Sequence, residues 1–112
     1  SDLMLIPVDS RNLNIIAIGD PIPQYVYGTN EKRKNKAGQE IYKLPVLISG
    51  SGERQDPTTT ITIAGAINVN KGLRLVFTNL VVQTWSLKGS DGVLRNGITL
   101  KADAVQTAPK GA

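Results

Sequence analysis

The chain has 112 residues, enough for one domain with a single hydrophobic core, and 40% of its residues are hydrophobic. It contains neither cysteine nor histidine, which excludes disulfides, thiolate or imidazole metal sites and a Ser-His-Asp triad from this chain. Thirteen basic residues against nine acidic ones give a net charge of +4, which favours a negatively charged partner.

The first half of the chain has the patterns of short strands. Valine, isoleucine and threonine are abundant, and no long window keeps apolar residues at helical spacing without a glycine or proline. Strands are predicted over 13–18, which ends at a Gly-Asp-Pro stop, over 24–27, and over 40–48. Pro45 lies within the third of these and predicts an edge position or a bulge.

The second half is predicted to contain longer strands. Residues 58–64 alternate threonine and isoleucine, so Ile61 and Ile63 face one side of a strand. A turn at 66–71 precedes a long strand over 73–87, with Asn79 at a bulge or bend, and a last strand follows over 96–105. The glycine- and aspartate-containing segment 88–92 between the two long strands predicts a hairpin.

Five or six strands without a long helix predict an all-β fold, either a small antiparallel barrel or a sandwich. Long bent strands favour the barrel, and the oligonucleotide/oligosaccharide-binding (OB) fold fits best. We expect one OB-like domain over 1–106 and a flexible tail over 107–112. The chain has no run of 18 apolar residues and its start lacks a basic signal-peptide region, so a cytoplasmic location is expected.

A basic segment, residues 31–36 (EKRKNK), carries +3 of the +4 net charge. Several cations on one flexible hairpin can displace the counterions of a phosphate backbone, so this segment is a candidate nucleic-acid contact. The alternative is a solvated hairpin that is kept soluble by its charge. The candidate phosphate-binding residues of the segment are Lys32, Arg33, Lys34 and Lys36.

Aromatic residues on the predicted strands are candidate stacking platforms for bases. Tyr25 and Tyr27 precede the basic segment, Tyr42 follows it, and Trp85 lies among polar residues. The alternative is core packing, which we expect for Phe77. Further cations on strands and loops could extend a positive track, although each could equally be an ordinary solvated residue; they are Arg54, Arg74 and Lys101.

Residues 71–81 (KGLRLVFTNLV) are similar to a glycine-led strand of bacterial single-stranded DNA-binding proteins. The segment 83–86 (QTWS), the hairpin and residues 97–105 (GITLKADAV) resemble the closing hairpin of the same family, and 18–21 (IGDP) is compatible with its order. The chain also resembles small proteins encoded beside replication genes on actinobacterial mobile elements. These resemblances imply an OB fold, single-stranded DNA binding and a homo-oligomer, a dimer or tetramer. The tail 107–112 lacks the family's acidic tip.

The leading hypothesis is a non-enzymatic protein that binds single-stranded nucleic acid, DNA before RNA, with little sequence preference and no cofactor or metal. Replication, recombination or mobile-element transfer is the expected process. The second hypothesis is an assembly module that oligomerises through β-strand edges, with Pro45 marking such an edge. An enzyme is disfavoured because the usual acid-base and metal-binding side chains are missing.

Overall fold

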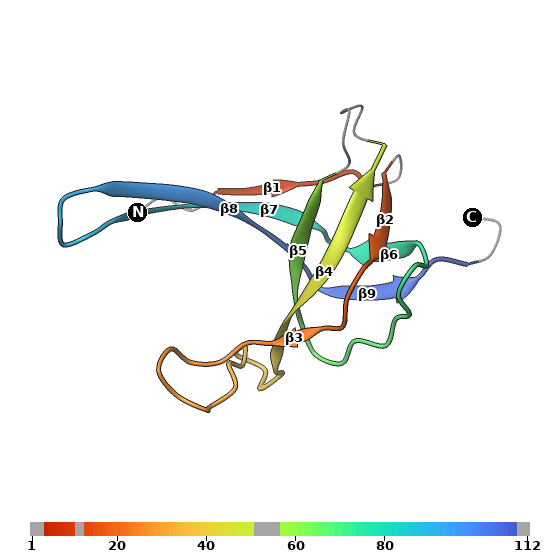
Figure 1. Ribbon diagram of the computed structural model, residues 1–112, viewed down its shortest axis with the longest axis horizontal. Coiled ribbons are helices and arrows are strands. Elements are labelled where there is room, and N and C mark those ends of the chain that lie inside the picture. Colours follow the sequence, from red (N-terminus) through yellow and green to blue (C-terminus); the bar gives the residue numbers. More distant parts are fainter. Residues whose placement is uncertain (1–3, 11–12, 51–56, 110–112) are drawn as a thin grey trace.

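The computed structural model describes residues 4–10, 13–50 and 57–109, and throughout these residues the chain is all-β (Figure 1). No helix in the described part has the length and apolar character needed to cross a membrane. The strands are β1 (Met4–Pro7), β2 (Asn14–Ala17), β3 (Ile22–Pro23), β4 (Ile41–Ser49), β5 (Thr58–Ala64), β6 (Leu75–Thr78), β7 (Val81–Lys88), β8 (Leu94–Ala102) and β9 (Ala104–Thr107).

The strands form a mixed sheet. Its order is β1-β7-β8-β5-β4-β2, with β3 also paired to β4, and β6 and β9 form a second, two-stranded sheet. All pairs are antiparallel except β5 with β8, which run parallel. The expectation of a purely antiparallel barrel is therefore wrong. β2 meets the chain before β6 through the isolated bridge between Ile16 and Arg74 and through the hydrogen bond from the Gly72 N–H to the Ala17 carbonyl. No ladder pairs β2 with β6, so the described residues form no closed barrel.

One long hairpin runs through both sheets. Leu75 lies opposite Thr107 in the β6–β9 pair, and Lys88 lies opposite Leu94 in the β7–β8 pair, in the same continuous register. The strands bend together at Asn79 and Asp103, where the Asn79 amide donates to a carboxylate oxygen of Asp103 at 2.7 Å. Asn79 has a φ of 53°, which suits an asparagine at a bend. The predicted irregularity at Asn79 is thus a bend without an inserted residue.

The core lies under β4 and β5, where alternate side chains face inward. Leu44 and Val46 on β4, and Ile61 and Ile63 on β5, are fully buried. Phe77 on β6 is also buried, as expected, and Leu75, Leu80, Ile15 and Ala17 complete the cluster. The intervening residues of β4 and β5 point to the opposite face, which we call the outer face of the sheet.

The remaining differences from the sequence expectations concern short elements and the ends of elements. The predicted strand over 24–27 contains only the isolated bridge of Tyr25 with Lys32, and β3 lies just before it. β1 was not predicted, β9 extends to Thr107 inside the proposed tail, and residues 66–71 contain no helical turn. Pro45 lies in a strand that is paired with β5 at that position, so it does not mark a free edge. The Ile18 N–H donates a hydrogen bond to the Pro45 carbonyl. The pairing of β2 with β4 ends here, because Pro45 has no N–H with which to donate the next hydrogen bond to β2.

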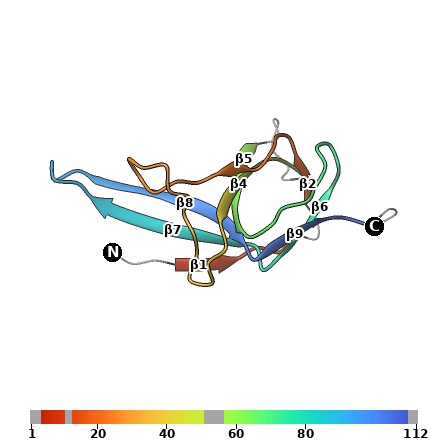
Figure 2. The same ribbon diagram turned by 90° about the horizontal axis from the view of Figure 1, so that it is seen from below.

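The projecting end of β7 and β8, residues 84–98, extends away from the core as an arm, which is visible in both views (Figures 1 and 2). The molecule is elongated, with extents of 51 × 33 × 21 Å. At the tip of the arm Asp91 accepts the backbone N–H of Val93 and pairs with Arg95 at 3.0 Å. The hydrogen bond from Arg95 lowers the pKa of Asp91 below its ordinary value. Asp91 thus stabilises the turn of the hairpin that segment 88–92 predicts.

The alternation on β4 predicts opposite consequences for two neighbouring residues. Leu44→Ala should lower the free energy of unfolding by about 2–5 kcal/mol, because it removes a fully buried side chain and leaves a cavity. Lys43→Ala, on the outer face, should change it by less than about 0.5 kcal/mol. Chemical denaturation monitored by Trp85 fluorescence measures both, and equal losses would show that the two faces are wrongly assigned.

Candidate functional site

The basic segment lies inside a hydrogen-bonded meander of three short extended stretches, residues 24–41. The Arg33 N–H donates to the Gln24 carbonyl at 2.8 Å, and the Ile41 N–H donates to the Arg33 carbonyl at 3.0 Å. Tyr25 bridges Lys32 on one side, and Lys34 bridges Glu40 on the other. The cations therefore lie on the middle stretch of three hydrogen-bonded stretches, whereas the sequence predicted a flexible hairpin.

The alternation of an extended chain separates these cations. Lys32 and Lys34 point to one side of the meander, together with Tyr25 and Glu40, and Arg33 points to the other side. The Lys32 ammonium lies 3.0 Å from Oε2 of Glu40. That oxygen is shielded from solvent, and the Lys32 ammonium is its partner and supplies its compensating charge.

The ion pair holds Lys32 in its charged form. The hydrogen bond to Glu40, followed by the charge of that carboxylate, raises the pKa of Lys32 above its ordinary value of 10.5. A raised pKa means that the contribution of the pair to stability is complete below pH 10.5 and is lost as the pH rises through the raised value. At neutral pH Lys32 therefore fastens the meander, and its charge is already partly compensated.

The outer face of the sheet carries a row of polar side chains beside the meander. Lys43 on β4 lies opposite Thr62 on β5, and Thr62 lies opposite Lys101 on β8. In the neighbouring row Gln83 on β7 lies opposite Thr99 on β8. These residues share one face because directly opposed residues project to the same side of a sheet.

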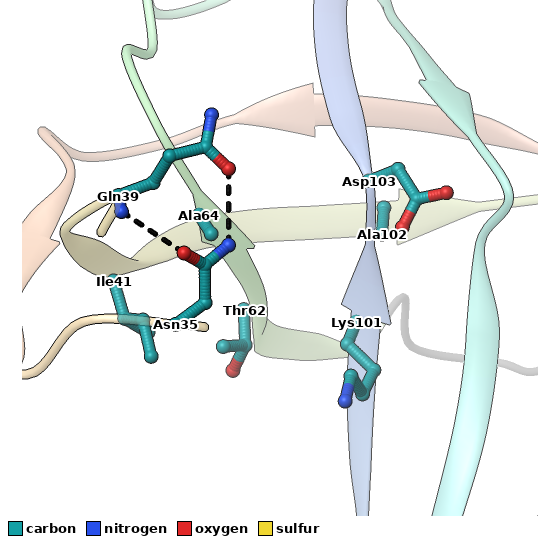
Figure 3. Close-up of a pocket in the computed structure, with 8 residues that line it drawn as sticks. All are labelled: Asn35, Gln39, Ile41, Thr62, Ala64, Lys101, Ala102 and Asp103. Carbon is teal, nitrogen blue, oxygen red and sulfur yellow. Dashed lines mark hydrogen bonds between the residues drawn. The ribbon is translucent and has the colours of Figure 1, made fainter. Parts of the chain in front are cut away.

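This face is hollowed into two adjoining pockets, which together we call the outer groove. The first, about 320 Å³, is lined by the row residues and the meander: Gln24, Arg33, Ile41, Lys43, Thr62, Gln83, Thr99 and Lys101. The second, about 380 Å³, shares three of these and is shown in Figure 3; its lining residues are Asn35, Gln39, Ile41, Thr62, Ala64, Lys101, Ala102 and Asp103. The groove thus runs from the base of the arm to Asp103.

Three cations line the outer groove: Arg33, Lys43 and Lys101. The ion pairs found among the described residues involve none of them, since these join Lys32 to Glu40, Lys71 to Asp20 and Arg95 to Asp91. The first pocket has no carboxylate in its lining. Its cations therefore produce a positive potential that is available to an anion.

Trp85 lies on the same face of β7 as Gln83, farther along the arm. Its partner across the ladder is Gly97, and a methyl group placed on Gly97 would lie only 2.5 Å from the indole ring. The ring therefore covers the backbone of Gly97 and remains 38% exposed. An indole supported from below and open above can stack on a planar ligand.

The structure brings only some of the sequence candidates together. Arg33 and Lys101 line the groove, and Trp85 lies on the same face of the arm. Lys32 and Tyr25 lie on the other side of the meander, Lys34 and Lys36 are exposed, and Tyr27 is fully exposed at a turn.

Tyr42 is only half-buried and lines separate pockets with Ala66, because it shares its strand face with buried Leu44. Arg74 lies at the β2–β6 bridge, and Arg54 is outside the described residues.

Sequence reasoning missed Lys43, Gln24, Gln83 and Thr99. Each is a polar residue on a strand or beside one. The strand order brings Lys43, Gln83 and Thr99 to the face of Lys101, and the meander places Gln24 beside Arg33. The single available signal was Lys43 between Tyr42 and Leu44, which predicts an outward-facing side chain.

The described residues contain no group of three or more acidic, cysteine or histidine side chains that could hold a metal ion. No protein-family model matches the chain, and no curated protein matches it. The function is therefore argued from the geometry and charge of the outer groove.

The contact between Trp85 and Gly97 predicts a change in fluorescence. Gly97→Ala should displace the indole, because the new methyl group would overlap it, and should shift the emission of this only tryptophan to longer wavelengths. Stability should change by less than about 1 kcal/mol, because alanine is favoured over glycine in a strand and the arm lies outside the core. Thr99→Ala, the next residue on the same strand face, is the control. Unchanged emission in Gly97→Ala would rule out the packing described.

Proposed function

We propose that this chain is a non-enzymatic OB-type protein that binds single-stranded nucleic acid, DNA before RNA, in the outer groove. The observation that carries the proposal is the presence of three cations on one hollowed face, outside the ion pairs of the described residues, with a supported tryptophan on the adjoining arm. The resemblance to single-stranded DNA-binding proteins favours DNA and a cytoplasmic role in replication, recombination or mobile-element transfer.

The strand adjacency supports the OB assignment. When β6–β7 and β8–β9 are each counted as one bent strand, the five strands in chain order are β2, β4, β5, β6–β7 and β8–β9. In space β2 lies beside β4, β4 beside β5, β5 beside β8–β9, and β8–β9 beside β6–β7. The first of these five strands, β2, meets the fourth at the Ile16–Arg74 bridge. An OB fold is a partly open five-stranded barrel that binds ligands on its second and third strands, between the first-second and fourth-fifth loops. Here those parts correspond to β4 and β5, the meander and the arm, which are the elements around the groove.

The proposed mechanism divides the ligand between charge and stacking. Arg33, Lys43 and Lys101 contact phosphates and release counterions, and exposed Lys34 and Lys36 add charge nearby. Trp85 stacks on a base, which contributes about 1–3 kcal/mol and requires a base that is not already stacked in a duplex. These contacts favour single strands and carry little sequence information.

Replacing the groove cations should weaken binding and reduce its dependence on salt. The slope of log K against log salt concentration is negative. Its magnitude should decrease by about 0.7, the value for one phosphate contact of a single strand, in each of Arg33→Gln, Lys43→Gln and Lys101→Gln. Binding of a labelled oligonucleotide, followed by anisotropy over a salt series, measures this slope.

Lys71→Gln is the matched control, because Lys71 lies outside the groove lining, beside Asp20 at 3.9 Å. It removes the same charge and should leave the slope nearly unchanged. An equal decrease in the magnitude of the slope in all four variants would mean that binding depends on the overall positive charge of the chain and not on the groove. Absence of binding at low salt would refute the proposed function.

A second candidate function, assembly through strand edges, is favoured by β1. This strand ends the strand order, and all four of its residues are exposed. Met4, Thr84 and Ile98 form one row across β1, β7 and β8, on the face opposite Trp85, and Met4 and Ile98 are both largely exposed. An exposed apolar edge of this kind favours pairing with another chain.

Light scattering tests this candidate. Self-association through the arm predicts a dimer or larger species for the unmodified chain and a monomer for the double variant Met4→Lys and Ile98→Lys, whose replaced side chains lie outside the core. A chain that is monomeric without these changes would exclude this role. An oligomer that does not bind nucleic acid would make assembly the leading function.

A further inference from the structure

The two pockets of the outer groove differ in chemistry. The pocket beside Gln83 has three cations and no carboxylate, which suits phosphate. Ile41, Ala64 and Ala102 form the apolar part of the pocket in Figure 3, and its polar lining is Asn35, Gln39, Thr62, Lys101 on β8 and Asp103 at the bend just after β8. Its volume of about 380 Å³ lies within the range of about 300–1,000 Å³ that is usual for small-ligand sites. A small apolar surface with several hydrogen-bonding groups beside it suits a planar heterocycle with polar edges.

One wall of this pocket is held rigidly. Oδ1 of Asn35 accepts the N–H groups of Ala37 and Gln39, at 3.0 and 2.9 Å, and its Nδ2 donates to Oε1 of Gln39 at 3.0 Å. These bonds occupy Asn35 and leave the Gln39 amide nitrogen as a donor. A wall that is already ordered costs little conformational entropy when a ligand binds.

The opposite wall is Asp103, which Figure 3 shows across the pocket from Asn35 and Gln39. Asn79 donates to its Oδ2 at 2.7 Å, and the Asp103 backbone N–H donates to the Thr78 carbonyl at 2.9 Å. The carboxylate is therefore fixed in position at the bend of the long hairpin. An ionised carboxylate can only accept hydrogen bonds, so it selects a ligand edge that donates.

We propose that this pocket receives one base of the bound strand and that Asp103 makes it select bases with an exocyclic amino group, cytosine over thymine. The inference rests on the proposed function. The N4 amino group of cytosine donates to a carboxylate, whereas thymine presents a carbonyl oxygen at the same ring position and would face Asp103 with lone pairs. Lys101, a donor, complements the acceptor atoms of the cytosine ring. Binding along the rest of the groove stays independent of sequence.

The test compares oligo-dC with oligo-dT of equal length at mildly alkaline pH, where cytosine is unprotonated, by anisotropy with the full chain. The unmodified chain should bind oligo-dC about tenfold more tightly, as expected for one added hydrogen bond to a charged group. Asp103→Asn should bring the two affinities together, because an amide can donate to thymine as well as accept. The asparagine still offers Asn79 an acceptor, so the bend is kept.

Asp20→Asn is the control, since it removes the same charge outside the groove and should leave the preference for oligo-dC intact. Equal binding of the two oligonucleotides by the unmodified chain would overturn the inference and leave the proposed function standing. A preference that persists in Asp103→Asn would overturn the role of Asp103. Failure to bind either oligonucleotide would overturn the proposed function, and the inference with it.

Discussion

The structure depends on the alternation of side chains along two paired strands, β4 and β5. Their inward residues, Leu44, Val46, Ile61 and Ile63, are fully buried, and burial of such apolar side chains is the main stabilising contribution in a small domain. The same alternation turns Lys43 and Thr62 outward. The core and the outer groove are therefore two sides of one sheet, and the groove inherits the rigidity of the core beneath it.

The sequence was most informative where a signal was local. The Thr/Ile alternation of 58–64 predicted β5 with the correct ends, and the Gly/Asp-rich segment 88–92 predicted the turn between β7 and β8. The parallel pairing of β5 with β8 has no local signal, because β6 and β7 lie between the two strands in the sequence. The all-β class was therefore predictable, whereas the mixed sheet was not.

The candidate site was predictable only in part for the same reason. The stretches of the meander around Lys32 and Arg33 are too short to show a strand period, so the sequence could not reveal that these neighbours face opposite ways. Lys43 could be predicted to face outward, but its proximity to Arg33 depends on how the meander folds over the sheet. Trp85 could equally have been a core residue. Its exposure depends on β7 and β8 extending beyond the core, which no residue pattern indicates.

The unbroken register of the long hairpin has a consequence for the order of folding. The pairs from Lys88–Leu94 to Leu75–Thr107 form one ladder, so closure from the turn at 89–92 brings each successive pair together with little added loop entropy. Contacts that are distant in sequence, such as those between β6 and β9, are therefore kinetically accessible. The parallel β5–β8 contact has no such route, so we expect it to form after the hairpin, at a larger cost in loop-closure entropy.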